Sequence, residues 1–342
     1  MQTGFFDLSN RYQALSEHGD PLERLESLID WSCFLPLLNQ AFQKHRKSPA
    51  GRKPFHRLMM FKILVLQSLY NLSDHQMEYQ IKDRLSFMRF LGLGLEDRVP
   101  DEKTLWLFRE VLTKTGTIKR LFKRFEEVLD KQGYSAACGT LVDASIVEAP
   151  RQRNSREDNK GIKEGRPPEA LMADTPRGRQ KDVDARWTKK HYETYYGYKD
   201  HIAVDTQYKL IRGYEVTAAN MADIKCFPGL LTQINPEDRR VWADSAYYSE
   251  AMEKRLSTLG YESRVSRRST KHWPEMSDRV RENRRRSKIR KRVEHVFGFM
   301  ENSMGGKRIR CIGLLRARAR IGLMNLVYNL CRFEQLHRLQ VA

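Results

Sequence analysis

Apolar residues recur every three or four positions through the first part of the chain, as they do along one face of an amphipathic helix. Two stretches also carry helix-start signals. Asp20 and Pro21 supply an N-cap and a first-turn proline, and Ser73 with Gln76 has the spacing of a capping box. The pattern predicts an all-helical N-terminal domain over residues 1–134, with a basic linker at 44–53 and helices at about 20–45, 54–72, 73–91, 101–113 and 117–131.

The pattern changes after Ala136, where short runs of β-branched and aromatic residues take over. The second and third of these runs are separated only by Thr206–Tyr208, which predicts a hairpin. The order of elements predicts an α/β domain over 135–342 with a mixed sheet flanked by helices. Its strands are expected at 139–147, 195–205, 209–218, 239–243 and 262–265, and its helices at about 223–234, 248–259, 277–303 and 314–339.

Residues 151–190 interrupt this second domain. The segment is basic and rich in Pro and Gly, and it contains almost no large apolar residues. Because such a composition cannot bury a core, we expect an extended or mobile loop.

The charge of the chain narrows the choice of partner. Over 342 residues, 62 Lys and Arg stand against 43 Asp and Glu, a net charge of +19. An excess of this size favours a nucleic-acid partner over a merely solvated basic surface, because phosphate neutralisation releases counterions. The five cysteines form no C-x-x-C pair, and Lys or Arg interrupts every apolar stretch before membrane-spanning length. We therefore expect a soluble protein of a reducing cytoplasm, without a membrane partner.

One acid stands in the middle of an apolar strand. The stretch GTLVDASIV places Asp143 between Val142 and the pair Ile146–Val147. Aspartate is rare in strands and costly to bury alone, so this carboxylate needs a cation, a metal or a donor network. Asp143 is therefore a candidate functional residue.

Two further acids complete a possible site. Asp244 ends the strand at 239–243, where catalytic groups collect in open α/β sheets, although a helix N-cap is the alternative. Glu294 borders the apolar stripe of the helix at 277–303, and a surface ion pair with Arg290 is its alternative. Three carboxylates, two on strands and one on a helix facing the sheet, suit two Mg²⁺ ions and phosphodiester chemistry.

The remaining acids receive structural interpretations. Asp205 is expected to form a turn in preference to serving as a fourth site carboxylate, and His201 lacks a second ligand at metal-binding spacing. Loop or cap roles are expected for Glu148, Asp200 and Asp223.

Four motifs occur in a characteristic order: LVDASIV, YYGYKDHIAVD, VWADSAYYS and RKRVEHVFGFMENSM. With them, and with the helical stretch from HRLMMFKILVL to VPDEKTLWLFRE, the chain resembles the DDE transposases of bacterial insertion sequences. The resemblance is specifically to the insertion sequence 5 family, whose catalytic domain is RNase H-like. It covers nearly the whole chain.

The resemblance implies a function for each part. The catalytic triad, which also holds the metals, falls on Asp143, Asp244 and Glu294. Two Mg²⁺ ions, with Mn²⁺ as a substitute, would support cleavage at the element ends and attack of the freed 3′-hydroxyls on target DNA. The helical domain would read terminal inverted repeats of double-stranded DNA, in a homodimer or larger synaptic assembly in the bacterial cytosol, at the nucleoid. Phosphate contacts are expected from the basic residues before the third acid: Arg284, Arg285, Arg286, Lys288, Arg290, Lys291 and Arg292.

The chain departs from this family's Tyr-x2-Arg-x3-Glu-x6-Lys pattern at two positions. Arg290 matches, but Ser287 replaces the tyrosine and Glu301 replaces the lysine. We expect Glu301 to form an ion pair with a nearby basic residue such as Lys307, in preference to joining the metal site.

Two other functions are compatible with the sequence. One is a DNA-binding regulator derived from a transposase, against which the three intact acids argue. The other is a metal-dependent nuclease or resolvase, which only a strand-transfer assay separates from a transposase.

Overall fold

The computed structural model describes residues 6–43, 53–135, 138–172, 175–190, 192–234, 237, 239–267 and 277–341. Most of the expected basic linker at 44–53 lies outside them. The chain divides into two compact units, one formed by Met1–Glu127 with Leu326–Ala342 and the other by Val128–Asn325. The last helix, α16 (Leu314–Val341), therefore contributes to both.

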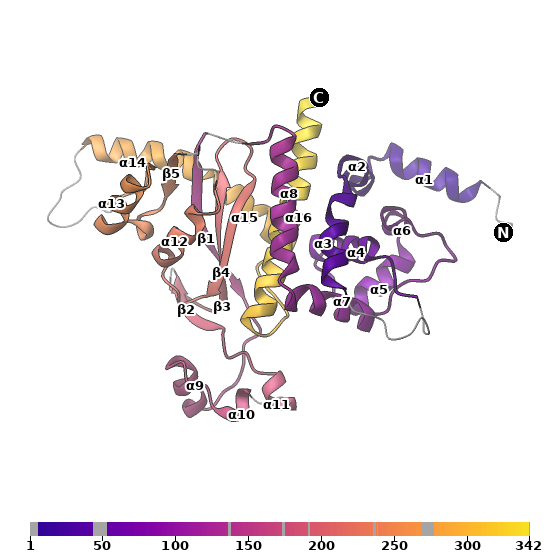
Figure 1. The fold of residues 1–342 in the computed structure, drawn as a ribbon, viewed down its shortest axis with the longest axis horizontal. Coiled ribbons are helices and arrows are strands. Elements are labelled where there is room, and N and C mark those ends of the chain that lie inside the picture. The colour runs from indigo at the N-terminus through magenta and orange to yellow at the C-terminus, as the bar shows by residue number, and fades with distance from the viewer. Residues whose placement is uncertain are drawn as a thin grey trace. The chain divides into compact units, whose positions relative to one another are not determined.

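The first unit is helical, as predicted (Figure 1). Its apolar residues bury a core in which Phe34, Phe61 and Leu64 are fully covered. Phe333 from the end of α16 packs edge-on against Phe125, with ring centroids 6.0 Å apart, so the C-terminal residues complete this core. The helices are α1 (Asp7–Glu17), α2 (Pro21–Leu28), η1 (Trp31–Phe34), α3 (Leu35–Ala41), α4 (Arg57–Leu69), α5 (Asp74–Asp83), α6 (Leu85–Leu91), α7 (Glu102–Lys114) and most of α8 (Thr117–Lys131).

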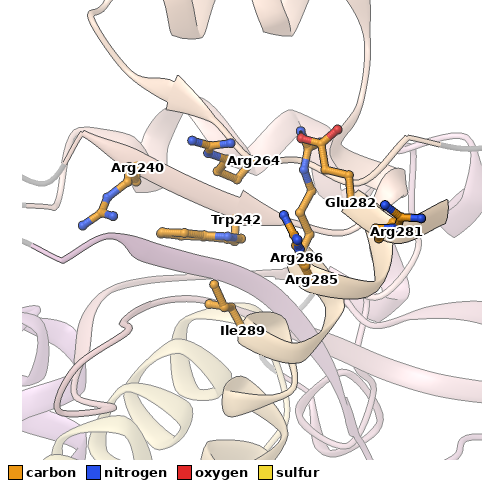
Figure 2. A pocket seen from close by; sticks show the side chains of 8 residues that line it. All are labelled: Arg240, Trp242, Arg264, Arg281, Glu282, Arg285, Arg286 and Ile289. Carbon is orange, nitrogen blue, oxygen red and sulfur yellow. Dashed lines mark hydrogen bonds and ion pairs between the residues drawn. The ribbon is translucent and has the colours of Figure 1, made fainter. Parts of the chain in front are cut away.

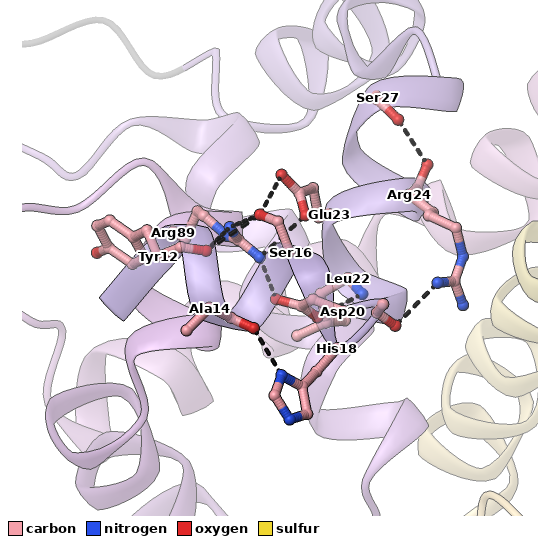
Figure 3. Close-up of polar contacts among 11 residues, drawn as sticks. Tyr12, Ala14, Ser16, His18, Asp20, Leu22, Glu23, Arg24, Ser27 and Arg89 are labelled. Atoms are coloured by element: carbon pink, nitrogen blue, oxygen red, sulfur yellow. Dashed lines mark hydrogen bonds and ion pairs between the residues drawn. The ribbon is translucent and has the colours of Figure 1, made fainter. Parts of the chain in front are cut away.

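Arg89 ties three of these helices together (Figure 3). From α6 it donates hydrogen bonds to the carbonyl of Tyr12 and the hydroxyl of Ser16 in α1. It also pairs with Asp20 at 2.6 Å and with Glu23 at 3.2 Å. Since Asp20 accepts the Leu22 amide as N-cap of α2, one guanidinium fixes both the cap and the α1–α2 connection.

Two predicted helices are broken, and α1 was not predicted. The helix expected over 20–45 ends at Leu28, because Asp30 accepts the amide of Ser32 and starts the 3₁₀ turn η1. The helix expected over 73–91 begins with the predicted Ser73–Gln76 capping box but breaks at Arg84, whose backbone is extended. In both places a local capping or backbone conformation overrides the helical periodicity.

The second unit contains a six-stranded mixed sheet, which confirms the predicted fold class. The long strand β3 pairs antiparallel with β1 along one edge and with β2 and then β4 along the other. The β1–β5 and β5–β6 pairs are parallel. The predicted hairpin is β3–β4. The strands are β1 (Thr140–Glu148), β2 (Arg186–Lys190), β3 (Glu193–Asp205), β4 (Ile211–Ala218), β5 (Arg240–Ala243) and β6 (Glu262–Ser263).

Helices cover both faces of this sheet. One face packs its small and β-branched residues, including Val142, Ala203 and Val241, against Phe227 and Leu230 of α12 (Asp223–Leu231). On the other face, α15 (Arg292–Asn302) lies against β1 (Figure 1). The helix expected over 277–303 is thus two helices, α14 (Ser277–Arg290) and α15, separated at Lys291. The unit also contains η2 (Ser245–Tyr247) and α13 (Glu250–Thr258).

The segment 151–190, expected to be an extended or mobile loop, is not extended throughout. The segment forms α9 (Arg156–Lys163), α10 (Glu169–Met172), α11 (Pro176–Arg179) and strand β2. Its few apolar residues, Ile162 and Leu171, are buried, and Asp182 is fully buried. Asp182 accepts hydrogen bonds from the Tyr198 hydroxyl and the Gly313 amide, so a polar network supplies what the missing apolar residues cannot.

None of the helices in the described ranges is long and apolar enough to cross a membrane.

Candidate active site

Asp143 occupies the middle of β1 and faces the side of the sheet that α15 covers. Its neighbours Val142 and Ala144 point the other way, because side chains alternate along a strand and Val142 packs in the α12 cluster. One carboxylate oxygen accepts the Ala144 amide at 2.8 Å. The side chain keeps 23% of its exposure, so it is shielded from water but still reachable from solvent.

The carboxyl of Asp143 holds its proton more tightly than usual. Its pKa is raised from 3.8 to about 6, chiefly by burial and in smaller part by the negative charge of Asp244. The Ala144 hydrogen bond and the positive charges of Arg290 and Lys190 lower the same pKa without cancelling the effect of burial. An additional positive charge near Asp143 would therefore stabilise its ionised carboxylate.

Asp244 lies beside Asp143 because of the parallel pairing of β1 with β5. The register matches Val142 with Ala243, so the next residue of each strand falls on the same face. Asp244 also caps η2 by accepting the Ala246 amide at 2.7 Å, so the N-cap interpretation of its sequence position is correct. The cap and the acid pair coexist, because a carboxylate has lone pairs for both.

Arg290 reaches the acid pair from the end of α14. Its Nη1 atom lies 3.9 Å from Oδ2 of Asp143, and no ion pair joins it to Glu294 in the described structure. The surface pair considered from sequence is therefore replaced by a contact between the helix and the strand. At 30% exposure the guanidinium can still meet a phosphate.

Glu294 lies in the first turn of α15 and is exposed. Its neighbours Val293 and Val296 are buried, which fixes the helix against the sheet and leaves the carboxylate at the border of the packed stripe. Within the described residues, no three acidic, histidine or cysteine side chains gather closely enough to hold a metal ion. The structure thus brings Asp143 and Asp244 together and leaves Glu294 apart from them.

The donor set fits a divalent cation in its chemistry. Carboxylate oxygens are the ligands that Mg²⁺ and Mn²⁺ prefer. A bound cation would favour the ionised carboxylate and so lower the pKa of Asp143, which burial raises. Asp143 and Asp244 would hold the ion, with Glu294 as the third candidate.

The seven basic residues expected to contact phosphate differ in their hydrogen-bond partners and in their exposure to solvent. Arg286 donates to the carbonyl of Val265 at 2.6 Å and pairs with Glu282, and Arg292 donates to the carbonyl of Thr206 at 2.5 Å. These two side chains brace their helices. Arg290 is half-buried, and exposed positions are held by Arg284, Arg285, Lys288, Lys291 and Arg292 itself.

The pairing predicted for Glu301 is found. Its Oε2 atom lies 3.9 Å from Nζ of Lys307, just beyond the end of α15. The prediction for Asp205 is also confirmed, because this buried carboxylate accepts the Leu210 amide at 3.0 Å and pairs with Arg212 at 3.3 Å.

Sequence reasoning missed two polar positions. Asp200 is wholly buried in β3, where Asn325 donates to it at 3.1 Å and burial raises its pKa to about 7, so its assignment as a loop or cap residue is wrong. Lys190, whose charge acts on Asp143, ends a strand that sequence reasoning had placed in a loop. Asp200 stands among the alternating buried positions Tyr198, Ile202 and Val204 of the predicted strand, a pattern that could have indicated its burial, whereas no apolar pattern surrounds Lys190.

Comparisons with known proteins identify the family of the chain. Residues 134–330 match the transposase DDE domain family, and residues 10–111 match a transposase domain family. A structure described as a piggyBac transposase synaptic complex with hairpin DNA is similar at a TM-score of 0.46 and 12% identity, over 93% of this chain and 75% of that one. That score is too low to support a conclusion about this chain. The match to the DDE domain covers more than half of the sequence, and the chain belongs to the DDE transposases.

Proposed function

We propose that this transposase binds the terminal inverted repeats of a bacterial insertion sequence, cleaves at the element ends and joins the freed 3′-hydroxyls to target DNA. The observation that carries this proposal is that Asp143, in the middle of β1, lies beside Asp244, which directly follows the parallel strand β5. The narrower assignment to the insertion sequence 5 family rests on the sequence motifs.

Asp143, Asp244 and Glu294 are proposed as the metal ligands and catalytic residues. Divalent ions bound there, two of Mg²⁺ or Mn²⁺, would activate the attacking oxygen and stabilise the leaving oxygen of the phosphodiester. The exposed position of Glu294 requires a local adjustment of α15 toward the acid pair when metal and DNA bind.

The chain's own residues position the DNA strand. Arg290 lies beside Asp143, where it can donate to a non-bridging phosphate oxygen and hold the scissile bond over the acids. Four exposed basic side chains supply phosphate contacts, which do not distinguish one DNA sequence from another. They are Arg284, Arg285, Lys288 and Lys291. Sequence choice is assigned to the helical unit.

The cleavage step is tested with DNA that carries the inverted repeats. Asp143→Ala, Asp244→Ala and Glu294→Ala should each abolish Mg²⁺-dependent cleavage while binding of the ends persists. Cleavage by Glu294→Ala at the wild-type rate would remove that residue from the proposed site. A strand-transfer assay with the wild-type protein separates joining from simple cutting.

The assignment of end recognition is tested by photo-crosslinking the full chain to inverted-repeat DNA. We expect base-specific crosslinks within residues 10–111 and none there with scrambled DNA at the same salt. If crosslinks that depend on the inverted-repeat sequence occur in the second unit instead, that unit recognises the element ends.

A homodimer or larger assembly is proposed because two element ends must be processed together. Light scattering of the protein with inverted-repeat DNA should give at least two chains for each pair of ends. A single chain holding a single end throughout the reaction would contradict this stoichiometry.

A further inference from the structure

A basic cavity of about 450 Å³ lies beside the acid pair, between β5, β6 and α14. Figure 2 shows the ring of Trp242 at its centre, with arginines around it. Gly139, at the start of β1, has a φ of +115°, and a Cβ there would lie 1.9 Å from the Trp242 ring, so the close packing of the ring needs glycine. The arginines that line the cavity are Arg240, Arg264, Arg281, Arg285 and Arg286.

The positive charge in this cavity is only partly compensated. Arg286 pairs with Glu282, and Arg264 pairs with Glu262. In the described part of the chain, the remaining three arginines make no ion pair with an acid, although Arg240 lies 5.8 Å over the Trp242 ring. Guanidinium groups gathered around one space repel each other unless an anion joins them. The cavity therefore favours an anionic ligand, which its exposed arginines Arg240, Arg281 and Arg285 can reach.

Two elements that line the cavity also lead to the acid pair. Trp242 precedes Asp244 by two residues, so both side chains project from the same face of β5. On α14, Arg286 lies one turn before Arg290, which contacts Asp143. Four residues of helix rise about 6 Å. A strand with its scissile phosphate at the acids can therefore bring a neighbouring phosphate to the cavity.

We infer that this cavity binds a phosphate of an unpaired DNA strand next to the bond that is cut. In a duplex the phosphates line the outside of a wide cylinder and contact surfaces, whereas a single strand can turn its backbone into a concave site. The Trp242 ring, which is 6% exposed, forms the apolar floor of the cavity, and the uncompensated arginines receive the phosphate. This inference rests on the proposed function, since it takes DNA as the partner.

The test measures binding in EDTA, where no cleavage occurs. Fluorescence anisotropy compares three labelled probes of the same sequence: a short single strand with a 5′-phosphate, the same strand with a 5′-hydroxyl, and the blunt duplex. The variant Arg281→Ala/Arg285→Ala removes two lining arginines, and Arg284→Ala removes an exposed arginine of α14 that does not line the cavity. Thermal melting checks that each variant is folded.

We expect the double variant to bind the single strands at least about tenfold more weakly, because charge-assisted hydrogen bonds are lost. Its affinity for the duplex should fall only as much as that of Arg284→Ala. Preference for the 5′-phosphate would identify a strand end as the source of the phosphate, and equal affinity for both single strands would identify an internal phosphodiester.

Equal losses for Arg284→Ala and the double variant on the single strands would overturn the inference, as would equal losses of the double variant on single strand and duplex. These outcomes are independent of the proposed function, because cleavage of inverted-repeat ends requires the acids, which these variants retain. A failure of cleavage with intact single-strand selectivity would count against the proposed function alone.

Discussion

Replacing Asp143 by asparagine should stabilise the metal-free protein. Asparagine has nearly the same shape, and its side-chain oxygen can still accept the Ala144 amide. The change removes the negative charge that burial and Asp244 disfavour. When no cation is bound at the site, the free energy of the buried negative charge destabilises the folded protein.

The size of the effect follows from the pKa of Asp143. The rise from 3.8 to about 6 corresponds to roughly 3 kcal/mol at 1.36 kcal/mol per pH unit. Since the side chain is 23% exposed, solvent screening reduces this figure, and we expect about 1–3 kcal/mol.

The sign of the effect depends on pH. A carboxyl whose pKa is higher in the folded state binds more protons there, so its ionisation lowers the free energy of unfolding as pH rises from about 4 to 6. Asp143→Asn should therefore raise the melting temperature by several degrees at pH 8 and by almost nothing at pH 4. Glu301→Gln, at a half-buried position whose carboxylate pairs with Lys307, is the matched control.

Calorimetry in EDTA at pH 4 and pH 8 measures this difference. A second series with Mg²⁺ should stabilise the wild-type protein and leave Asp143→Asn almost unchanged, because a ligand stabilises only the state that binds it. An unchanged melting temperature for Asp143→Asn at pH 8, or an equal gain at both pH values, would refute the reasoning.

Three further predictions concern neighbouring residues. Arg290→Ala should weaken cleavage strongly and raise the pKa of Asp143 further, seen as a shift of the pH–rate profile to higher pH; an unchanged profile would separate Arg290 from the acids. Glu301→Gln should leave metal-dependent cleavage unchanged, because its carboxylate pairs with Lys307, and loss of cleavage with the fold intact by circular dichroism would place it in the site. Asp205→Ala should destabilise the protein by about 2–3 kcal/mol in denaturant melts, because the Leu210 amide loses its acceptor and Arg212 keeps only its exposed partner Asp130, and a loss below about 1 kcal/mol would contradict that role.

Sequence reasoning was most successful where a periodic pattern and a local signal agreed. The strand around Asp143, the hairpin over the Thr206–Tyr208 turn and the capping box at Ser73 all occur as predicted. It failed where tertiary contacts decide the backbone. The break at Lys291 and the order within 151–190 depend on partners far away in the sequence, such as those of Asp182.

The same limit applies to the candidate site. The sequence identified Asp143 and Asp244 separately, but only the parallel β1–β5 register puts them together. It could not show that Arg290 contacts Asp143 in preference to Glu294, because that choice depends on how α14 ends. The cavity around Trp242 could not be predicted from the sequence either, because its arginines come from three separate segments of the chain.

The central claim is that Asp143, Asp244 and Glu294 act together in metal-dependent DNA cleavage. The most direct measurement is cleavage of inverted-repeat DNA in Mg²⁺ by Asp244→Asn, with binding of the same DNA measured on the same preparation. Asparagine keeps the cap on the Ala246 amide, so the fold around η2 should be preserved. The account predicts wild-type binding and cleavage at background, whereas cleavage near the wild-type rate would contradict it.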